Sequence, residues 1–205
     1  MRNVFPLNPE LDYQTAMDAL KGYAFPRKAI SDAFARGDLI RVKKGLYVQS
    51  GRGIVPYSKE ILANMIYGPS YISLEYALAY YGLIPEHVEE VTSVTTGKSK
   101  RFATPVGMFS FMHLSVDYYG FGFNRKSLEE DRGFLLADPE KAVADRVLKE
   151  RGRFSLRSLR QFLFESLRID QAAFRKLDKG LFMEASKRSG KESLDILCRV
   201  SEGNV

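Results

Sequence analysis

Three cations lie around one glycine near the N-terminus, within the stretch Arg36 to Val48, which reads RGDLIRVKKGLYV. They are Arg41, Lys43 and Lys44, and the glycine is Gly45. Guanidinium and ammonium groups bind phosphate oxygens, so cations grouped at one turn suit a nucleic acid backbone. The apolar residues on both sides of the glycine predict two strands joined by this turn. We therefore predict a basic β-hairpin, with a solvated turn of no special function as the alternative.

Two short helices are predicted before the hairpin. The first begins at Asp12 and ends near Gly22, and the second has Pro26 in its first turn and ends at Gly37. Two helices followed by a basic hairpin are typical of a winged helix-turn-helix, in which a helix enters the major groove and the hairpin contacts flanking phosphates. The predicted DNA-contacting residues are Arg27, Lys28 and Ser31 on the second helix and Arg41, Lys43 and Lys44 on the hairpin.

The outward face of the second helix also carries an acid, Asp32. Its carboxylate would repel a phosphate. We expect it either to accept a hydrogen bond from a cytosine amino group or to pair with Lys28, four residues earlier on the same helix.

The chain is basic, with a formal net charge of +6 over 205 residues. The charge is +3 over residues 1–50, −3 over residues 51–145 and +6 over residues 146–205. Basic ends are compatible with nucleic acid or with an acidic partner, and an ordinary solvated surface is the alternative.

Composition excludes several classes of protein. No run of about 18 apolar residues is present, so we expect no membrane span, and the N-terminus lacks the apolar segment of a secretory signal. The single cysteine, Cys198, excludes an intramolecular disulfide and a multi-thiolate metal site. We expect a cytoplasmic protein.

A domain boundary is predicted at residues 49–57, QSGRGIVPY, which have the composition of a linker. Helices are predicted from Ser58 to Tyr67 and from Ser73, as the capping residue, to Gly82. The strand candidates in this part are Tyr71–Ile72, Val91–Thr95, Met108–Leu114, Tyr118–Phe123 and Gly133–Ala137. The loop between Val91–Thr95 and Met108–Leu114 carries Lys98, Lys100 and Arg101.

The fold class predicted from these patterns is α+β. A winged helix-turn-helix over residues 1–50 precedes an α/β domain over residues 51–205. In the second domain we expect a small, mainly antiparallel sheet and a helical C-terminal part from about residue 138.

A second group of cations lies in this C-terminal part. If residues 154–168 form one helix, Leu156, Leu159, Leu163 and Leu167 face inward and several arginines share a flank. That flank is a possible second basic surface for nucleic acid or for the antagonism of a partner, and a solvated helix face is the alternative. Its residues are Arg153, Arg157, Arg160 and Arg168.

No catalytic constellation is evident. The sequence has no Asp-x-Asp pair for Mg²⁺, no Gly-x-x-x-x-Gly-Lys loop and no Gly-x-Ser-x-Gly elbow. Asp138, Glu140 and Lys141 follow one another as in some metal-dependent nucleases, but the start of a helix explains them more simply. His87 and His113 have no second ligand nearby in the sequence. We expect no enzymatic activity, no cofactor and no metal, with a metal-dependent nucleic-acid enzyme as the less favoured alternative.

Three short motifs occur in an ordered series. The first, Gly-x-Leu-x-Arg followed by Gly-x-Tyr, consists of Gly37, Leu39, Arg41, Gly45 and Tyr47. The second, a Ser-Leu and Ala-Leu helix closed by Gly-Leu, consists of Ser73, Leu74, Ala77, Leu78, Gly82 and Leu83. The third, Pro-Glu-Lys-Ala with a following Asp, consists of Pro139, Glu140, Lys141, Ala142 and Asp145. In order and spacing they resemble the AbiEi-type antitoxins of type IV toxin–antitoxin systems, although Tyr81 stands where many relatives have a histidine.

The resemblance covers roughly residues 11–150 and implies a transcriptional autorepressor that also opposes a toxin. Its implied partners are double-stranded DNA of an operator near its own gene and, functionally, a nucleotidyltransferase toxin, with direct contact left open. Two other readings stay open. One is a solitary winged-helix regulator without a toxin, and the other is a winged-helix module that contacts only proteins.

Overall fold

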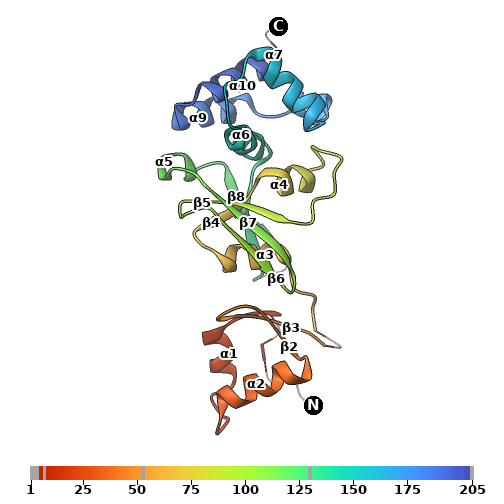
Figure 1. The fold of residues 1–205 in the computed structure, drawn as a ribbon, viewed down its shortest axis with the longest axis vertical. Helices are drawn as coiled ribbons and strands as arrows, with labels where there is room; N and C mark the ends of the chain where they lie inside the picture. The colour runs from red at the N-terminus through yellow and green to blue at the C-terminus, as the bar shows by residue number, and fades with distance from the viewer. Residues whose placement is uncertain (1–4, 7, 52–53, 129–130, 204–205) are drawn as a thin grey trace.

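The protein is described here by a computed structural model that covers residues 5–6, 8–51, 54–128 and 131–203. Its three parts follow one another along the long axis (Figure 1). An N-terminal α/β unit lies at one end, a six-stranded sheet lies in the middle, and the C-terminal helices lie at the other end.

The N-terminal unit consists of two helices on one face of a small antiparallel sheet. Asp12 caps the first helix by accepting a hydrogen bond from the Thr15 backbone N–H at 2.7 Å, Pro26 begins the second, and Gly37 ends it with φ of 77°. The sheet has the order β1-β3-β2. The elements are β1 Glu10–Asp12, α1 Tyr13–Ala19, α2 Pro26–Arg36, β2 Leu39–Lys43 and β3 Leu46–Gln49. The predicted helices and hairpin are confirmed as elements.

The two faces of this small sheet belong to different cores. Leu39 and Tyr47 pack with the helices α1 and α2 in a small cluster of their own. Val42, Leu46 and Val48 belong instead to the large core of the rest of the molecule. The N-terminal unit is therefore docked through its sheet onto the second part of the chain, although the sequence predicted a linker there. Two linker residues, 52 and 53, lie outside the described residues.

A buried ion pair reinforces this docking. The Glu10 carboxylate on β1 lies 2.9 Å from a guanidinium nitrogen of Arg132, and both side chains are almost completely buried. Glu10 also accepts a hydrogen bond from the backbone N–H of Ser58, at 2.6 Å. Each partner compensates the buried charge of the other, so this contact fixes where the small sheet lies.

The central sheet has the order β6-β7-β5-β4-β9-β8 and is mixed. The pairs β4–β5, β6–β7 and β8–β9 are antiparallel, whereas β5–β7 and β4–β9 are parallel. The sheet is larger than predicted. Three of its five strand pairs are antiparallel, in line with the prediction, but two are parallel, which the alternation of side chains could not indicate because it marks the faces of a strand and not the direction of its neighbours. The strands are β4 Ser70–Ile72, β5 Val91–Thr95, β6 Lys100–Thr104, β7 Gly107–His113, β8 Phe123–Ser127 and β9 Gly133–Ala137.

Three helices accompany this sheet, namely α3 Lys59–Ile66, α4 Leu74–Tyr80 and α5 Val116–Tyr119. Residues 118–123, predicted as a strand, contain the end of α5 and a turn instead, and the strand begins at Phe123. Lys100 and Arg101, predicted in a loop, begin β6. This edge strand is mostly exposed and begins with two charged residues. Charges on an edge strand commonly prevent pairing with another chain. They also break the apolar pattern by which a strand is predicted.

The C-terminal part is helical, as predicted. Its expected helix over residues 154–168 is shorter than predicted. It begins at Leu156 and ends in a π-helical turn, in which Leu167 donates its backbone N–H to the Phe162 carbonyl at 2.8 Å. The elements are α6 Pro139–Lys149, α7 Leu156–Gln161, η1 Phe162–Ser166, α8 Gln171–Arg175, α9 Lys179–Ser189 and α10 Glu192–Glu202. Over the residues described, no helix is long and apolar enough to cross a bilayer.

Candidate functional site

One face of α2 forms a continuous surface with the hairpin. Arg27, Ser31 and Phe34 follow one another at helical spacing, and Arg27 and Ser31 are exposed. The guanidinium carbon of Arg41, on β2, lies 5.0 Å from the centre of the Phe34 ring. Phe34 itself packs edge-on against Tyr47 of β3, at 5.3 Å between ring centres. The structure thus brings Arg41 to the helix at the end opposite Arg27.

The neighbouring residues of α2 are partly neutralised. The Lys28 ammonium nitrogen lies 3.5 Å from an Asp32 carboxylate oxygen, and both side chains are exposed. Of the two roles expected for Asp32, the pair with Lys28 is thus formed in this structure. An exposed pair of this kind is weak, so either side chain can turn to another partner at little cost.

The three cations of the hairpin do not point in one direction. Arg41 pairs across the strands with Tyr47 and Lys43 with Leu46, so Val42 forms a β-bulge between them. The bulge turns Lys43 to the sheet face opposite Arg41. Lys43 is half-buried there and donates a hydrogen bond to the Ile66 carbonyl. Burial and then the charge of Lys100 lower its pKa.

Only Lys44 remains at the hairpin tip itself. It is exposed and precedes Gly45, whose φ of 81° lies in the left-handed region that favours glycine. The Gly45 carbonyl accepts the first free N–H of α1, from Tyr13, at 2.9 Å. The tip is therefore held against the start of α1.

The four arginines of the predicted second basic surface lie in different surroundings. Arg168 follows η1 with a left-handed φ of 52° and pairs with Glu86, while Arg153 is exposed before the α7 cap, Ser155. Arg157 and Arg160 line one cavity together. Arg168 is separate from the other two because it lies beyond the end of this helical segment.

A buried polar cluster, which the sequence analysis did not predict, joins the second and third motifs. The Lys141 ammonium nitrogen lies 2.8 Å from an Asp145 carboxylate oxygen, and neither side chain is exposed. The other Asp145 oxygen accepts hydrogen bonds from Ser73 at 2.6 Å and from Tyr71 at 3.0 Å. Lysine and aspartate four residues apart on the apolar face of α6 were the available signal.

Aromatic rings enclose the Lys141 ammonium group. Its nitrogen lies 3.4 Å from the ring centre of Tyr118, 4.6 Å from that of Phe121 and 5.3 Å from that of Tyr71. A Cβ atom at Gly122 would lie 3.1 Å from the Lys141 side chain. Burial lowers the pKa of Lys141, and the charge of Asp145 opposes this. With no exposed member, the Lys141–Asp145 cluster holds strand, helix and loop together and offers no surface to a ligand.

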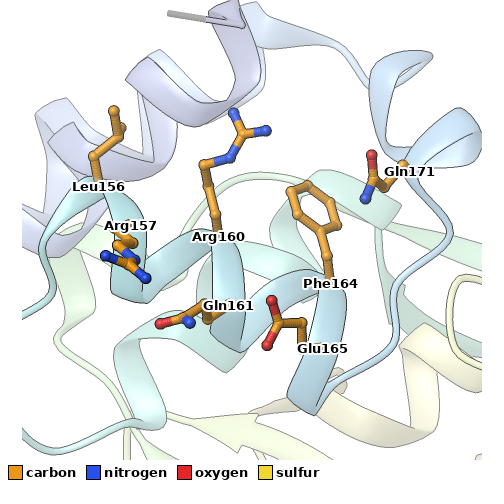
Figure 2. Close-up of a pocket in the computed structure, with 7 residues that line it drawn as sticks. All are labelled: Leu156, Arg157, Arg160, Gln161, Phe164, Glu165 and Gln171. Atoms are coloured by element: carbon orange, nitrogen blue, oxygen red, sulfur yellow. The ribbon is translucent and has the colours of Figure 1, made fainter. Parts of the chain in front are cut away.

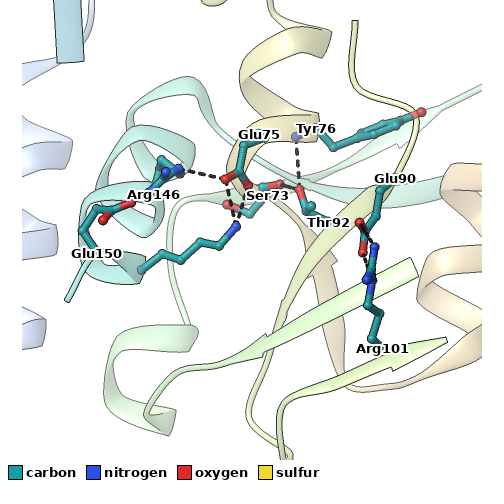
Figure 3. A network of polar contacts seen from close by, with 9 residues as sticks. Ser73, Glu75, Tyr76, Glu90, Thr92, Arg101, Arg146 and Glu150 are labelled. Carbon is teal, nitrogen blue, oxygen red and sulfur yellow. Dashed lines mark hydrogen bonds and ion pairs between the residues drawn. The ribbon is translucent and has the colours of Figure 1, made fainter. Parts of the chain in front are cut away.

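Ser73 stands at the N-cap position of α4 but does not cap it, contrary to expectation. The Ser73 hydroxyl donates a hydrogen bond to the Asp145 carboxylate, and a residue of β5 caps the helix instead. Thr92 of β5 accepts from the Tyr76 backbone N–H at 3.1 Å and donates to the Ser73 carbonyl at 2.6 Å (Figure 3). Leu74 has a φ of 59° at this point. In the second motif, the left-handed conformation of Leu74 thus accompanies a Ser73 side chain that points inward to Asp145.

The start of α6 departs from expectation in the same way. Asp138 is its N-cap residue, but its carboxylate makes no cap hydrogen bond and instead accepts from the Asn124 amide, at 2.9 and 3.0 Å. Farther along α6, Arg146 lies 2.9 Å from Glu75 of α4 and Lys149 lies 2.8 Å from the same carboxylate (Figure 3). These contacts tie α4 to α6 and serve no evident chemistry.

The raised pKa values of two tyrosines at this cluster lead to a prediction of how the free energy of unfolding depends on pH. Burial, followed by the charge of Asp145, raises the pKa of Tyr71 and of Tyr118 well above 10.0. In the unfolded chain both titrate near pH 10, so the unfolded state binds fewer protons above that pH and the free energy of unfolding falls as pH rises. Each tyrosine contributes about 1.4 kcal/mol per pH unit. Lys141, with its lowered pKa, acts in the opposite direction only up to about pH 10.4.

Urea unfolding between about pH 9 and 11.5 measures this dependence. We expect the decline above pH 10.5 to become shallower in Tyr118→Phe. A free energy of unfolding that stays constant over this interval would contradict the burial of these phenols.

Comparison with known proteins assigns no family to the chain, because no family model and no curated protein matches its sequence. Within the described residues, no group of three or more His, Cys, Asp or Glu side chains is placed to hold a metal ion.

Proposed function

We propose that the N-terminal unit is a winged helix-turn-helix that binds double-stranded DNA, and that the protein is a transcriptional autorepressor. The observation that supports this most is the surface shared by α2 and the hairpin. Arg27 and Ser31 are exposed on α2, and Arg41 extends the same surface from β2 across the Phe34 ring. A helix and a hairpin that present cations together can place one in the major groove and the other on the flanking phosphates.

In this proposal α2 is the helix that reads base edges. Arg27 and Ser31 face the groove, and Arg41 and Lys44 contact phosphates. Lys28 joins them when it leaves Asp32. Lys43 contributes to the electrostatic field around the hairpin but not to direct contact, because its ammonium group lies against the Ile66 carbonyl.

The antitoxin role is the second half of the proposal and rests on the resemblance of the three motifs. Residues of the second and third motifs meet in the Lys141–Asp145 cluster, so they act together in one part of the fold. Co-expression with a nucleotidyltransferase toxin from a neighbouring gene tests this half. Rescue of growth supports it, whereas growth arrest alongside normal DNA binding identifies a solitary regulator.

Binding to upstream DNA is the test of the repressor half. Fluorescence anisotropy is measured on labelled DNA from immediately upstream of the protein's own gene and on a scrambled duplex, across a salt series. A protein that covers about four to six phosphates should show a log–log slope of affinity against salt of roughly −4 to −5. We expect that slope, together with preference for the upstream sequence.

Two results would contradict this expectation. A shallow slope with equal, weak binding to both duplexes would exclude DNA as the partner and favour a module that contacts proteins. A requirement for Mg²⁺, with loss of intact DNA over time, would favour the enzyme alternative.

A further inference from the structure

A cavity of about 480 Å³ lies among the C-terminal helices (Figure 2). These helices are far from the N-terminal unit (Figure 1). One face of the continuous α7–η1 segment supplies most of its wall, and the first residue of α8 lies across from it. The lining residues are Leu156, Arg157, Arg160, Gln161, Phe164, Glu165 and Gln171.

The sequence builds this wall by helical spacing. Leu159 and Leu163 are buried on the inward face. Arg157, Arg160 and Phe164, spaced three and four residues apart, share a neighbouring face and line the cavity. Phe164 lies in the π turn, and its ring packs edge-on against Phe174 of α8, 5.4 Å between ring centres. The π turn and the α8 contact together fix the ring at the cavity wall.

The two guanidinium groups of the cavity are uncompensated. Among the residues described, Arg157 and Arg160 take part in no ion pair, whereas Arg146 and Arg168 nearby are paired with glutamates. Glu165 is the one acid in the lining, and it also makes no ion pair among the residues that the structure describes. Two positive charges and one separate carboxylate therefore face the same space.

We propose that this cavity binds a nucleoside phosphate. Guanidinium groups bind phosphate oxygens through paired hydrogen bonds, which is the role of Arg157 and Arg160. An aromatic ring stacks on a base of any sequence, which is the role of Phe164. The side chains that remain, Gln161, Glu165 and Gln171, supply donors and acceptors for the base edge or the ribose.

An acidic peptide fits the same lining less well. Its carboxylates would meet Arg157 and Arg160 but would leave the Phe164 ring without a partner. A cavity of this volume has room for one small ligand. The site is separate from the proposed DNA surface, so its failure would leave the repressor proposal untouched.

Binding of ATP and GTP that carry an N-methylanthraniloyl label tests the proposal on the full-length protein. We expect saturable binding with Kd below about 100 µM, as a few charge-assisted hydrogen bonds and one stacked ring provide. Unlabelled triphosphate should displace the label at least about tenfold better than adenosine or inorganic phosphate, because only the whole nucleotide engages both ends of the cavity.

Substitutions locate the site. Arg160→Ala and Arg157→Gln should each weaken binding about tenfold or more, and Phe164→Leu about fivefold. Arg153→Ala removes an exposed cation of the same segment outside the cavity and should change nothing. Circular dichroism confirms the fold of each variant, and because Arg157 is exposed, Arg157→Gln provides a variant that keeps the fold.

Several outcomes would overturn the proposal. These are no saturable binding at about 1 mM nucleotide, equal loss in Arg153→Ala and in the cavity variants, and displacement by inorganic phosphate as effective as by the triphosphate. Displacement by oligoglutamate in preference to nucleotide would assign the cavity to an acidic peptide instead.

Discussion

Replacing Arg41 by glutamate is expected to weaken binding to the upstream DNA about 100-fold at moderate salt. The Arg41 side chain is exposed, and the Phe34 ring at 5.0 Å holds its guanidinium group beside α2. The substitution removes one phosphate contact and adds repulsion, so the log–log salt slope should become shallower by about 2. Affinity should fall on specific and scrambled duplexes alike, because a phosphate contact carries no sequence information.

A matched control separates this effect from net charge. Arg175→Glu changes the charge by the same amount at an exposed position on α8. The C-terminal helices, to which α8 belongs, lie at the other end of the molecule (Figure 1). This variant should leave affinity within about threefold of the natural protein, because charges beyond a Debye length are screened. If Arg41→Glu behaves like Arg175→Glu, the hairpin is not part of the DNA surface.

A complementary substitution on α2 distinguishes positioning from readout. Ser31→Ala removes a hydroxyl from the exposed face without changing charge. In the proposed orientation it lowers the preference for upstream over scrambled DNA and leaves the salt slope unchanged. The pair of variants thus assigns phosphate contact to the hairpin and base contact to the helix.

The sequence predicted local elements well where capping and turn residues mark them. Asp12, Pro26, Gly37 and Gly45 each took the backbone position that their chemistry favours. These preferences depend on only a few neighbouring residues, so they can be read from the sequence without knowledge of the tertiary fold.

What the sequence did not predict depends on contacts between distant residues. Ser73 looked like a cap by every local criterion, yet its hydroxyl serves Asp145, 72 residues away, while Thr92 caps the helix from a neighbouring strand. The bulge at Val42 likewise turned Lys43 away from Arg41 toward Ile66, where the second part of the chain supplies an acceptor. In both cases a partner far along the chain outweighed a local preference.

Replacing Asp145 by alanine is expected to destabilise the protein by about 3–5 kcal/mol, because it leaves the fully buried Lys141 ammonium group without its carboxylate. Ser73 and Tyr71 lose their acceptor in the same step, which adds to the loss. A small protein has a total stability of about 5–15 kcal/mol, so the variant should unfold at a much lower urea concentration. The aromatic rings around Lys141 do not replace the carboxylate, since they provide attraction but no acceptor for its hydrogen bond.

The double variant Lys141→Met, Asp145→Leu shows whether charge or packing is responsible. Removing both charges together leaves apolar side chains of similar volume among Tyr71, Tyr118 and Phe121, so the loss should be clearly smaller than the sum of the two single losses. Lys149→Met, on the same helix, removes an ion pair with Glu75 that is partly exposed and should cost about 1 kcal/mol or less. An Asp145→Ala variant as stable as Lys149→Met would mean that the buried pair does not hold the fold together. In that case the second and third motifs meet for a reason other than stability.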